Sequence, residues 1–240
     1  MIVFRFMKPI LIRYNHKLTC LKAVTFLFLS ALFLGSCQKS KVEEPKIQSA
    51  ANIVNATIGM PQIAFFINKS RVHGELLKYT SESGYFITFP GTLGFDVAAD
   101  GITDYILKTN FTFKQNTYHT IFITGESTSV SALFTEDDLT NPPSGKSKIR
   151  FVNLSPDAGN LVLSLKNGTA LFPDQIYKSA SQFLTLDPGV YDLQLKTATG
   201  TVLINKNVTL ISGIIYTAWA NGMRFGTSNS PLGLQFRSIN

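Results

Sequence analysis

The segment VYDLQLK, residues 190–196, alternates between apolar and polar side chains from Tyr191 onward. Every second residue from Tyr191 to Leu195 is apolar, and the residues between them are charged or carry an amide. A period of two residues is typical of a β-strand with one buried face and one solvent-exposed face. The Pro188-Gly189 pair that precedes the segment predicts a tight turn, because proline fixes φ and glycine accepts a positive φ. This segment therefore predicts a strand of an antiparallel sheet.

Comparable segments fill the chain after residue 50. In the second half of the chain, the other segments predicted as strands are 149–151, 161–166, 181–186, 202–209, 213–221 and 232–238. In the first half they are 63–67, 84–89, 104–111, 117–125 and 130–134. Turn signals such as Asn167-Gly168 separate them, and no helical period is present. About seven strands for every ~90 residues favour a β-sandwich.

The two halves of the chain repeat one another. The segment VNAT at 54–57 recurs as VNLS at 152–155, and FPG at 89–91 recurs as DPG at 187–189, both at an offset of 98 residues. Further matches are Phe95 with Leu193, Val97 with Leu195, Tyr118 with Tyr216 and, at an offset of 97, Phe111 with Val208. The slip of one residue at Phe111 is expected to lie in a loop. The repetition predicts two copies of one structural unit.

We expect the two copies to form β-sandwich domains at 50–135 and 147–240. Between them, residues 136–146 begin with three acids, Glu136, Asp137 and Asp138, and continue with Pro142-Pro143. This composition predicts a solvent-exposed, semi-rigid linker. Calcium bound by the three acids is the alternative interpretation, but consecutive residues point in different directions and the EF-hand spacing is absent.

The positive charge of the chain is concentrated at its N-terminus. The formal net charge is +7. Residues 1–36 contain five basic residues and no acidic one, which leaves 17 basic against 15 acidic residues in the remainder. Because the predicted domains are nearly neutral, the composition argues against nucleic-acid binding.

Residues 1–36 have the features of a secretory signal peptide. A basic region precedes 23–34, AVTFLFLSALFL, which contains no charge. Twelve helical residues span only about 18 Å, too short for a bilayer core of roughly 30 Å. Leu34-Gly35-Ser36-Cys37 resembles the lipobox of bacterial lipoproteins, which implies cleavage before Cys37 and lipidation of that residue. The alternative is an ordinary signal peptide in which the cysteine occurs by chance.

The predicted mature chain begins with Cys37, its only cysteine, because Cys20 lies in the segment to be removed. Several acyl chains on one cysteine would anchor the protein stably in a membrane. Gln38, rather than an aspartate, follows Cys37 and resembles an outer-membrane address. We therefore expect an outer-membrane lipoprotein that faces the periplasm or the cell surface, with residues 37–49 as a flexible tether.

The second half also resembles the domain-of-unknown-function family 4397. The segments that resemble this family are KIRFVNLSPDA (148–158), LTLDPGVYDL (184–193), VLI (202–204) and VTL (208–210), and the connector LFTEDDLTNPP (133–143) resembles the one between tandem copies. The first half matches weakly, because no Pro-Asp-Ala follows Asn55-Ala56-Thr57 and Phe89 replaces the aspartate before Pro-Gly. The resemblance implies immunoglobulin-like sandwiches in exported bacterial proteins, frequently lipoproteins, and assigns no catalytic residue. The expected fold class is therefore all-β: two tandem immunoglobulin-like antiparallel β-sandwich domains after a cleaved N-terminal signal helix.

The sequence contains no pattern that predicts catalysis. The predicted mature chain has two histidines, His73 in a predicted loop and His119 in a predicted strand, and neither has a nearby metal-binding partner in sequence. Serine-hydrolase, phosphate-binding and dinucleotide-binding glycine motifs are absent. We expect no metal, no cofactor and no enzymatic activity. A hydrolase that uses two surface carboxylates is the weaker alternative.

Aromatic side chains are the remaining candidates for ligand contact. Phe172 and Tyr177 belong to a predicted loop-and-edge region, and Trp219 lies on a late strand. Exposed rings at these positions could stack on sugars, whereas the competing interpretation places Trp219 in the core. The sequence thus predicts a lipid-anchored envelope protein with a non-catalytic binding, adhesion or scaffolding role, whose ligand is a protein or a glycan. The alternative is a carbohydrate-binding accessory lipoprotein for the capture of surface polysaccharide.

Overall fold

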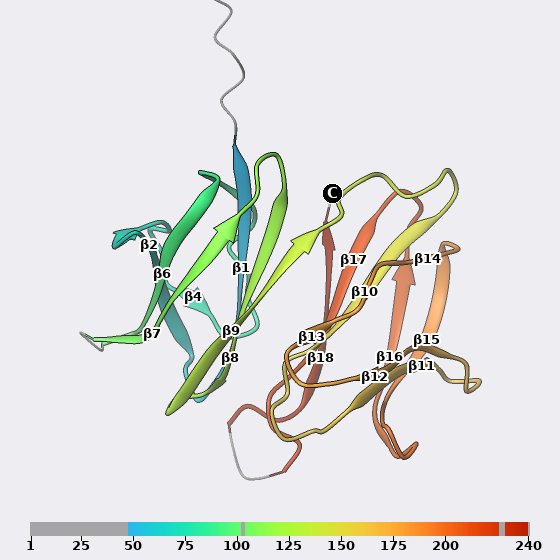
Figure 1. Cartoon of the computed structure of the whole chain (residues 1–240). Helices are drawn as coiled ribbons and strands as arrows, with labels where there is room; N and C mark the ends of the chain where they lie inside the picture. The colour runs from blue at the N-terminus through green and yellow to red at the C-terminus, as the bar shows by residue number, and fades with distance from the viewer. Residues whose placement is uncertain (1–47, 102–103, 226–228, 240) are drawn as a thin grey trace, which may run out of the picture. The chain divides into compact units, whose positions relative to one another are not determined.

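The structure is a computed structural model that describes residues 48–101, 104–225 and 229–239 (Figure 1). All regular elements in these residues are β-strands, which confirms the all-β prediction. The described ranges hold no helix capable of crossing a membrane. The predicted signal peptide, Cys37 and most of the predicted tether lie outside the described residues.

The first half of the described chain, β1 to β9, forms two sheets. One sheet has the order β5-β1-β8-β9, with β1 at Ser49–Ile58, β5 at Phe86–Thr88, β8 at Tyr118–Glu126 and β9 at Ser129–Asp137. The other has the order β3-β2-β6-β7, with β2 at Gln62–Ile67, β3 at Ser70–Arg71, β6 at Gly91–Ala99 and β7 at Tyr105–Phe113; β4, at Leu77–Lys78, also pairs with β2. An apolar cluster that includes Ile53, Phe65, Phe95 and Ile121 packs between these sheets.

The second half, β10 to β18, has the same arrangement. One sheet has the order β13-β10-β17-β18, with β10 at Ser147–Asn153, β13 at Ser179–Ala180, β17 at Ile215–Asn221 and β18 at Gly233–Ile239; β14, at Leu184–Leu186, also pairs with β10. The other has the order β12-β11-β15-β16, with β11 at Leu161–Leu165, β12 at Ala170–Gln175, β15 at Gly189–Thr197 and β16 at Val202–Leu210. The four sheets thus form two β-sandwiches.

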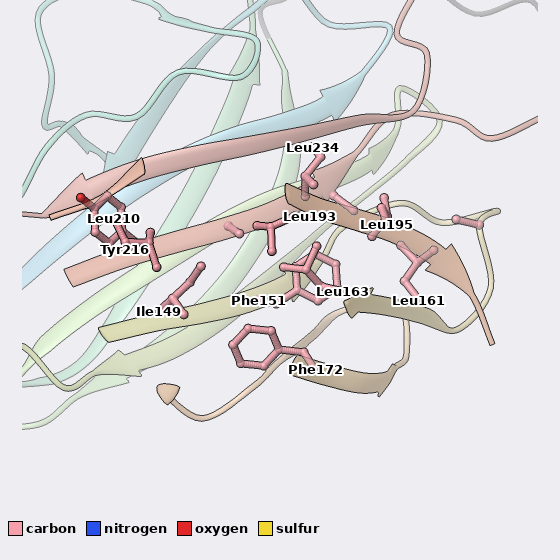
Figure 2. Packing of buried hydrophobic residues seen from close by; sticks show 13 residues of the cluster. Ile149, Phe151, Leu161, Leu163, Phe172, Leu193, Leu195, Leu210, Tyr216 and Leu234 are labelled. Carbon is pink, nitrogen blue, oxygen red and sulfur yellow. The ribbon is translucent and has the colours of Figure 1, made fainter. Parts of the chain in front are cut away.

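The predicted alternation in β15 matches its burial. Leu193 and Leu195 are almost completely buried, whereas Asp192, on the opposite face of the same strand, is exposed. Figure 2 shows both leucines within the core of the second half, together with Phe151 from β10 and Leu163 from β11. Every segment that the sequence predicts as a strand contains one in the structure.

The sheets are mixed, so the prediction of purely antiparallel sandwiches is wrong. β1 pairs in parallel with β8, with Ala50 opposite Tyr118, and β10 pairs in parallel with β17, with Lys148 opposite Ile215. Parallel neighbours need a crossover connection, and here the chain between the two strands passes through the opposite sheet before it returns. The first strand of each half therefore becomes a central strand of its sheet.

The two halves share hydrogen bonds as well as topology. Asn55 accepts a hydrogen bond from the Thr57 amide at 3.0 Å, and its Nδ2 donates to the Leu77 carbonyl at 3.0 Å. Asn153, 98 residues later, makes the corresponding bonds to Ser155 and Gln175. These two partners also lie 98 residues after those of Asn55, so the offset found in the sequence describes equivalent positions in space.

The slip of one residue lies in a hairpin loop, as predicted. Ala98 pairs with Tyr105 at the β6–β7 turn, whereas Lys196 pairs with Val202 at the corresponding turn of the second half, which is one residue shorter. The offset remains 97 beyond this loop.

This persistent offset corrects the predicted equivalence of Tyr118 and Tyr216. Ala51 pairs with His119, and its counterpart Ile149 pairs with Tyr216. His119 is therefore the residue equivalent to Tyr216. Consistent with this, Tyr216 is buried and Tyr118 is 46% exposed.

Candidate functional site

Four central strands, β1, β8, β10 and β17, are buried on both faces for most of their length. Their inner faces line the two sandwich cores. Their outer faces form a third apolar cluster, which we call the junction: Val54, Ala56 and Phe122 from the first half with Val152, Leu154 and Trp219 from the second. The two sandwiches therefore pack against each other through the outer faces of these sheets.

Polar contacts complete the junction. Thr124 Oγ1 donates to the Leu154 carbonyl at 2.8 Å, and Asn221 Nδ2 donates to the Tyr79 hydroxyl at 2.7 Å. Arg237 and Glu82 also form an ion pair between the two halves. These bonds fix the relative register of the two sheets, which an apolar contact alone would specify only weakly.

A buried ion pair links the end of β9 to β10. Asp137 Oδ1 lies 2.6 Å from Arg150 Nη1, and both side chains are almost fully buried. Asp137 Oδ2 also accepts hydrogen bonds from Thr120 Oγ1 at 2.5 Å and from the Tyr85 hydroxyl at 2.6 Å. Arg150 Nε donates to Thr217 Oγ1 at 3.0 Å. The pair is thus hydrogen-bonded on both sides, as a buried charge requires.

Tyr85 is held in its protonated form. Burial is the largest cause of a pKa well above the usual range of a tyrosine, and the negative charge of Asp137 raises it further. The phenol can therefore donate its hydrogen bond to Asp137 throughout the neutral pH range.

The three consecutive acids at the end of β9 have three different basic partners. Glu136 pairs with Lys114 at 2.6 Å and Asp138 pairs with Lys148 at 2.8 Å, while Asp137 pairs with Arg150. The prediction that the acids point in different directions is confirmed. The prediction of a solvent-exposed linker is wrong for Asp137, because β9 continues to this residue and buries it.

Their basic partners stabilise the charged forms of the two outer acids. Hydrogen bonds from Lys148 and Thr140 lower the pKa of Asp138 to about 2. A hydrogen bond from Lys114 lowers the pKa of Glu136. Within the described ranges, no group of three or more His, Cys, Asp or Glu residues is arranged to hold a metal ion. The carboxylates of this run bind ammonium and guanidinium groups instead.

Beside the buried ion pair, a cleft of about 940 Å³ opens between the two halves. We call it the junction cleft. Its lining residues are Tyr85, Asn116, Thr117, Tyr118, Glu136, Asp137, Asp138, Leu139, Thr140, Asn141, Gln182, Gly213, Ile215 and Ile239. One side of the cleft thus comes from the first half and the connector, and the other comes from the second half.

Tyr118 is the aromatic residue that the cleft exposes. The residue is 46% exposed, and its ring packs edge-on against Tyr85, with ring centroids 5.4 Å apart and an interplanar angle of 87°. Because the Tyr85 hydroxyl is bound to Asp137, the buried ion pair positions the ring that supports Tyr118. Amide, hydroxyl and carboxylate groups surround this ring and could hydrogen-bond a polar ligand.

Neither histidine belongs to the cleft lining. His119 is buried, lies 4.8 Å from the Phe134 ring, and its Nδ1 is 3.2 Å from Ser49 Oγ. Burial lowers the pKa of His119, so the ring is neutral at pH 7. His73 lies near Phe65, and its Nδ1 is 3.0 Å from the Glu75 carbonyl oxygen.

The structure does not bring the three predicted aromatic contacts together. Trp219 is 3% exposed and belongs to the junction, and Phe172 is 4% exposed and belongs to the core of the second half. Their predicted role as exposed rings is therefore wrong, and the competing core interpretation holds for Trp219. Tyr177 is half-buried beneath the Lys178 ammonium, and its ligand contact stays a prediction.

Sequence reasoning missed Tyr118 as a site residue. The matched positions in the repeat equated it with Tyr216, a core residue, and this concealed its exposure. To recognise that Tyr118 is not equivalent to Tyr216, one needs two facts that the sequence does not show. One is that Tyr118 pairs with Ala50, and the other is that the shorter β15–β16 loop changes the offset to 97.

Residues 49–164 match the profile of a family described as Domain of unknown function (DUF4397). The match includes all strands of the first half together with β10 and all but the last residue of β11 in the second. The sequence resemblance, in contrast, was expected to be strong in the second half and weak in the first. A search of curated proteins found no match.

Three solved structures are similar to parts of the chain. The C-terminal domain of AlgF from P. aeruginosa has 24% identity and a TM-score of 0.32, with 40% of this chain and 99% of that chain covered. CBMbc, a family CBM26 module from Eubacterium rectale Amy13K determined in complex with maltoheptaose, has 13% identity and a TM-score of 0.25, with coverages of 79% and 96%. The Bacillus anthracis TIE protein has 12% identity and a TM-score of 0.24, with coverages of 73% and 34%.

Proposed function

We propose that this protein is a lipid-anchored, non-catalytic component of the bacterial cell envelope that binds a polar ligand in the junction cleft. The observation that supports the binding role is the exposed Tyr118 ring among hydrogen-bonding groups in a cleft shared by both halves. Binding, adhesion and scaffolding are the roles that such a site can serve. We further propose that each half belongs to the immunoglobulin-like class of sandwiches.

The anchor is proposed from the sequence. The lipobox-like Leu34-Gly35-Ser36-Cys37 places the modified residue eleven positions before Gln48, where the described chain begins. We also propose an outer-membrane location, with the protein facing the periplasm or the cell surface, because Gln38 after Cys37 resembles an outer-membrane address. Metabolic labelling with a fatty-acid analogue is expected to modify the wild type and not Cys37→Ser. Labelling of both proteins would contradict the anchor.

The electrostatics of the cleft favour binding over hydrolysis. A glycosidase needs one carboxyl group that stays protonated near neutral pH, and its pKa must therefore be raised. The two solvent-accessible acids of the cleft, Glu136 and Asp138, have lowered pKa values because lysines bind them. Neither carboxyl is suited to act as a general acid.

A glycan is the alternative ligand class to a protein. An exposed aromatic ring beside amides and carboxylates is the combination that a sugar can use, because one sugar face is apolar and its hydroxyls need hydrogen-bond partners. The Tyr118 ring, Asn116 and Gln182 offer these groups in one cleft. On this alternative, the protein would be a carbohydrate-binding accessory in the capture of surface polysaccharide.

A glycan array tests this alternative with the chain from Gln38 to Asn240, which keeps the complete compact unit that begins at Ile47. Tyr118→Ala is expected to lower the affinity for any bound glycan at least tenfold. Tyr105→Ala, which changes a half-buried tyrosine of β7 outside the cleft lining, is the matched control and should leave the affinity unchanged. The absence of any bound glycan, or equal losses in both variants, would reject the carbohydrate alternative.

The binding role itself is tested by photo-crosslinking in the envelope, with a photoreactive amino acid at Tyr118 or at Tyr105, a tyrosine outside the cleft lining. Adducts from position 118 alone are expected. Adducts that form equally from both positions, or from neither, would contradict a ligand site in the junction cleft.

A further inference from the structure

We propose that the end of the molecule at which the described chain begins docks on the lipid surface through exposed apolar side chains of both halves. This inference rests on the proposed anchor at Cys37. It adds a second contact between the protein and the membrane, one made by the folded domains themselves. We call the contact surface the apolar end and define it by Ile87, Phe89, Val190 and Ile211.

These four residues are among the most exposed large apolar side chains in the described part of the chain. Ile87 is 66% exposed and Phe89 is 71% exposed in the first half, while Val190 is 69% and Ile211 is 60% exposed in the second. Single exposed apolar residues are ordinary on soluble proteins. Here the two pairs lie at the same end of the two sandwiches, and several exposed apolar side chains gathered at one end are typical of a contact site.

The first pair lies beside the beginning of the described chain. Thr88, the last residue of the edge strand β5, pairs with Ser49, the first residue of β1. Ile87 precedes Thr88 in the chain and Phe89 follows it. Ile87 is opposite Ala50, and its neighbour Phe86 packs on the core of the first half. Because successive side chains of a strand alternate, Ile87 and Phe89 point away from that core.

The second pair lies at the corresponding end of the second half. Gly189, which precedes Val190, pairs with Leu210, which precedes Ile211. The Gly213 amide donates to the Lys146 carbonyl at 2.8 Å, so this end adjoins the start of β10. The same Gly213 lines the junction cleft.

The cleft shows that the two ends are neighbours. Gly213 from the second half and Asn116 from the first both line it, and the Asn116 amide donates to the Gln48 carbonyl at 2.7 Å. The apolar pairs of both halves are therefore close to the residue from which the chain continues toward Cys37.

The short connection to Cys37 makes a lipid surface the occupant that fits. Ten residues separate Cys37 from Gln48. Because an extended chain spans at most about 3.6 Å per residue, the two residues can be no more than roughly 40 Å apart. A short tether raises the effective concentration of a second contact to about millimolar, so a weak apolar contact is sufficient. An anchored protein thus presents the apolar end to the bilayer continuously.

Charge contributes little to this contact. Among the described residues, Lys114, Lys146 and Lys148 near this end are each paired with an acid: Glu136, Asp187 and Asp138 respectively. The docking is therefore expected on zwitterionic phosphatidylcholine as well as on anionic lipid, with little dependence on salt. It would hold the junction cleft at the level of the lipid headgroups.

The test attaches the protein chemically to vesicles. A chain expressed from Cys37 has a single cysteine, which couples to a maleimide lipid in phosphatidylcholine vesicles. This coupling supplies the anchor without the cell, so the outcome does not depend on whether Cys37 is lipidated in vivo. The metabolic labelling described above tests that question separately.

Tryptophan at position 89 reports the contact. In Phe89→Trp, coupling to vesicles that contain dibrominated phosphatidylcholine should quench the new tryptophan at least twofold and shift its emission to the blue. The native Trp219 is buried in the junction, and the unmodified chain measures its constant background. Ile211→Trp repeats the measurement from the second half.

Ile176→Trp is the matched control at the opposite end. Ile176 is 55% exposed and lies beside the last residues of β10, since the Lys178 amide donates to the Asn153 carbonyl. No additional quenching is expected at this position. Equal quenching at positions 89 and 176, or quenching at neither 89 nor 211, would overturn the proposal.

Discussion

Asp137, the last residue of β9, lies 2.6 Å from Arg150 in the middle of β10, and this buried ion pair joins the two sandwiches across the connector. Neither charge is exposed to solvent, and each is hydrogen-bonded by hydroxyl groups of neighbouring strands. Removal of one charge would leave the other buried without a partner. The junction is therefore the part of the molecule most sensitive to single polar substitutions.

Asp137→Ala should lower the free energy of unfolding by about 3–5 kcal/mol, because Arg150 would stay buried without its counter-ion. Urea denaturation at pH 7 of the chain from Gln38 measures the change. Glu136→Ala removes the neighbouring, partly exposed ion pair with Lys114 and should cost less than about 1 kcal/mol. Similar losses in the two variants would show that burial does not determine the cost.

Tyr85→Phe should lower stability at pH 7 by about 1–3 kcal/mol, because Asp137 loses one charged hydrogen bond. The pKa of Tyr85 is raised in the folded state, so folding favours the neutral phenol. Its contribution to stability is fully present below about pH 10, the usual tyrosine value, and is lost as the pH rises above it. The stability difference between the wild type and Tyr85→Phe should therefore narrow above pH 10.

Urea denaturation between pH 7 and pH 11 measures this dependence. A Tyr85→Phe difference that widens above pH 10 would contradict the assigned hydrogen bond.

Asn55→Ala and Asn153→Ala should each destabilise the protein by about 1–3 kcal/mol, because each substitution leaves a buried amide and a buried carbonyl without partners. Thermal unfolding of the two variants tests whether the repeated positions are energetically equivalent. Asn110→Ala, on the exposed face of β7, should have an effect within about 0.5 kcal/mol. Stability unchanged in either buried variant would contradict its role.

Gly125→Ala should destabilise the first half by more than about 2 kcal/mol. Its φ is +99°, and a Cβ atom would lie 2.2 Å from the Ser129 carbonyl oxygen, which belongs to the backbone. Gly189→Val is the comparison, because φ there is +152° but no atom lies within 4 Å of the added Cβ. Backbone strain alone should cost that variant about 1 kcal/mol. The melting temperatures should rank wild type, Gly189→Val and Gly125→Ala in descending order.

Much of the fold could be predicted because its signals are local. The alternation in 190–196 identifies β15 and its buried face, and the matched positions of Asn55 and Asn153 identify the repeat. Strand β12 was missed because Pro173 interrupts it and an edge strand has no strict alternation. Local patterns therefore predict strands that face solvent on one side better than they predict irregular edges.

The junction could not be predicted in this way. A strand buried on both faces shows no alternation, so the pattern of β17 does not reveal that Trp219 packs between two sandwiches. The run of three acids has the composition of a linker, and only the proximity of Arg150 explains why Asp137 is buried. The junction cleft depends on the same non-local contacts, because Asp137 holds the Tyr85 hydroxyl and the Tyr85 ring in turn supports Tyr118.

The parallel pairing of β1 with β8 has a consequence for biosynthesis. Ala50 is translated 68 residues before Tyr118, the residue that pairs with it. The edge of β1 that pairs with β8 therefore has no partner strand until nearly the whole first sandwich has emerged from the ribosome. The second copy repeats this delay between Lys148 and Ile215. Pairings between such distant residues slow folding and leave strand edges open to aggregation. Chaperones that shield extended segments are thus expected to act on this protein before its folding is complete.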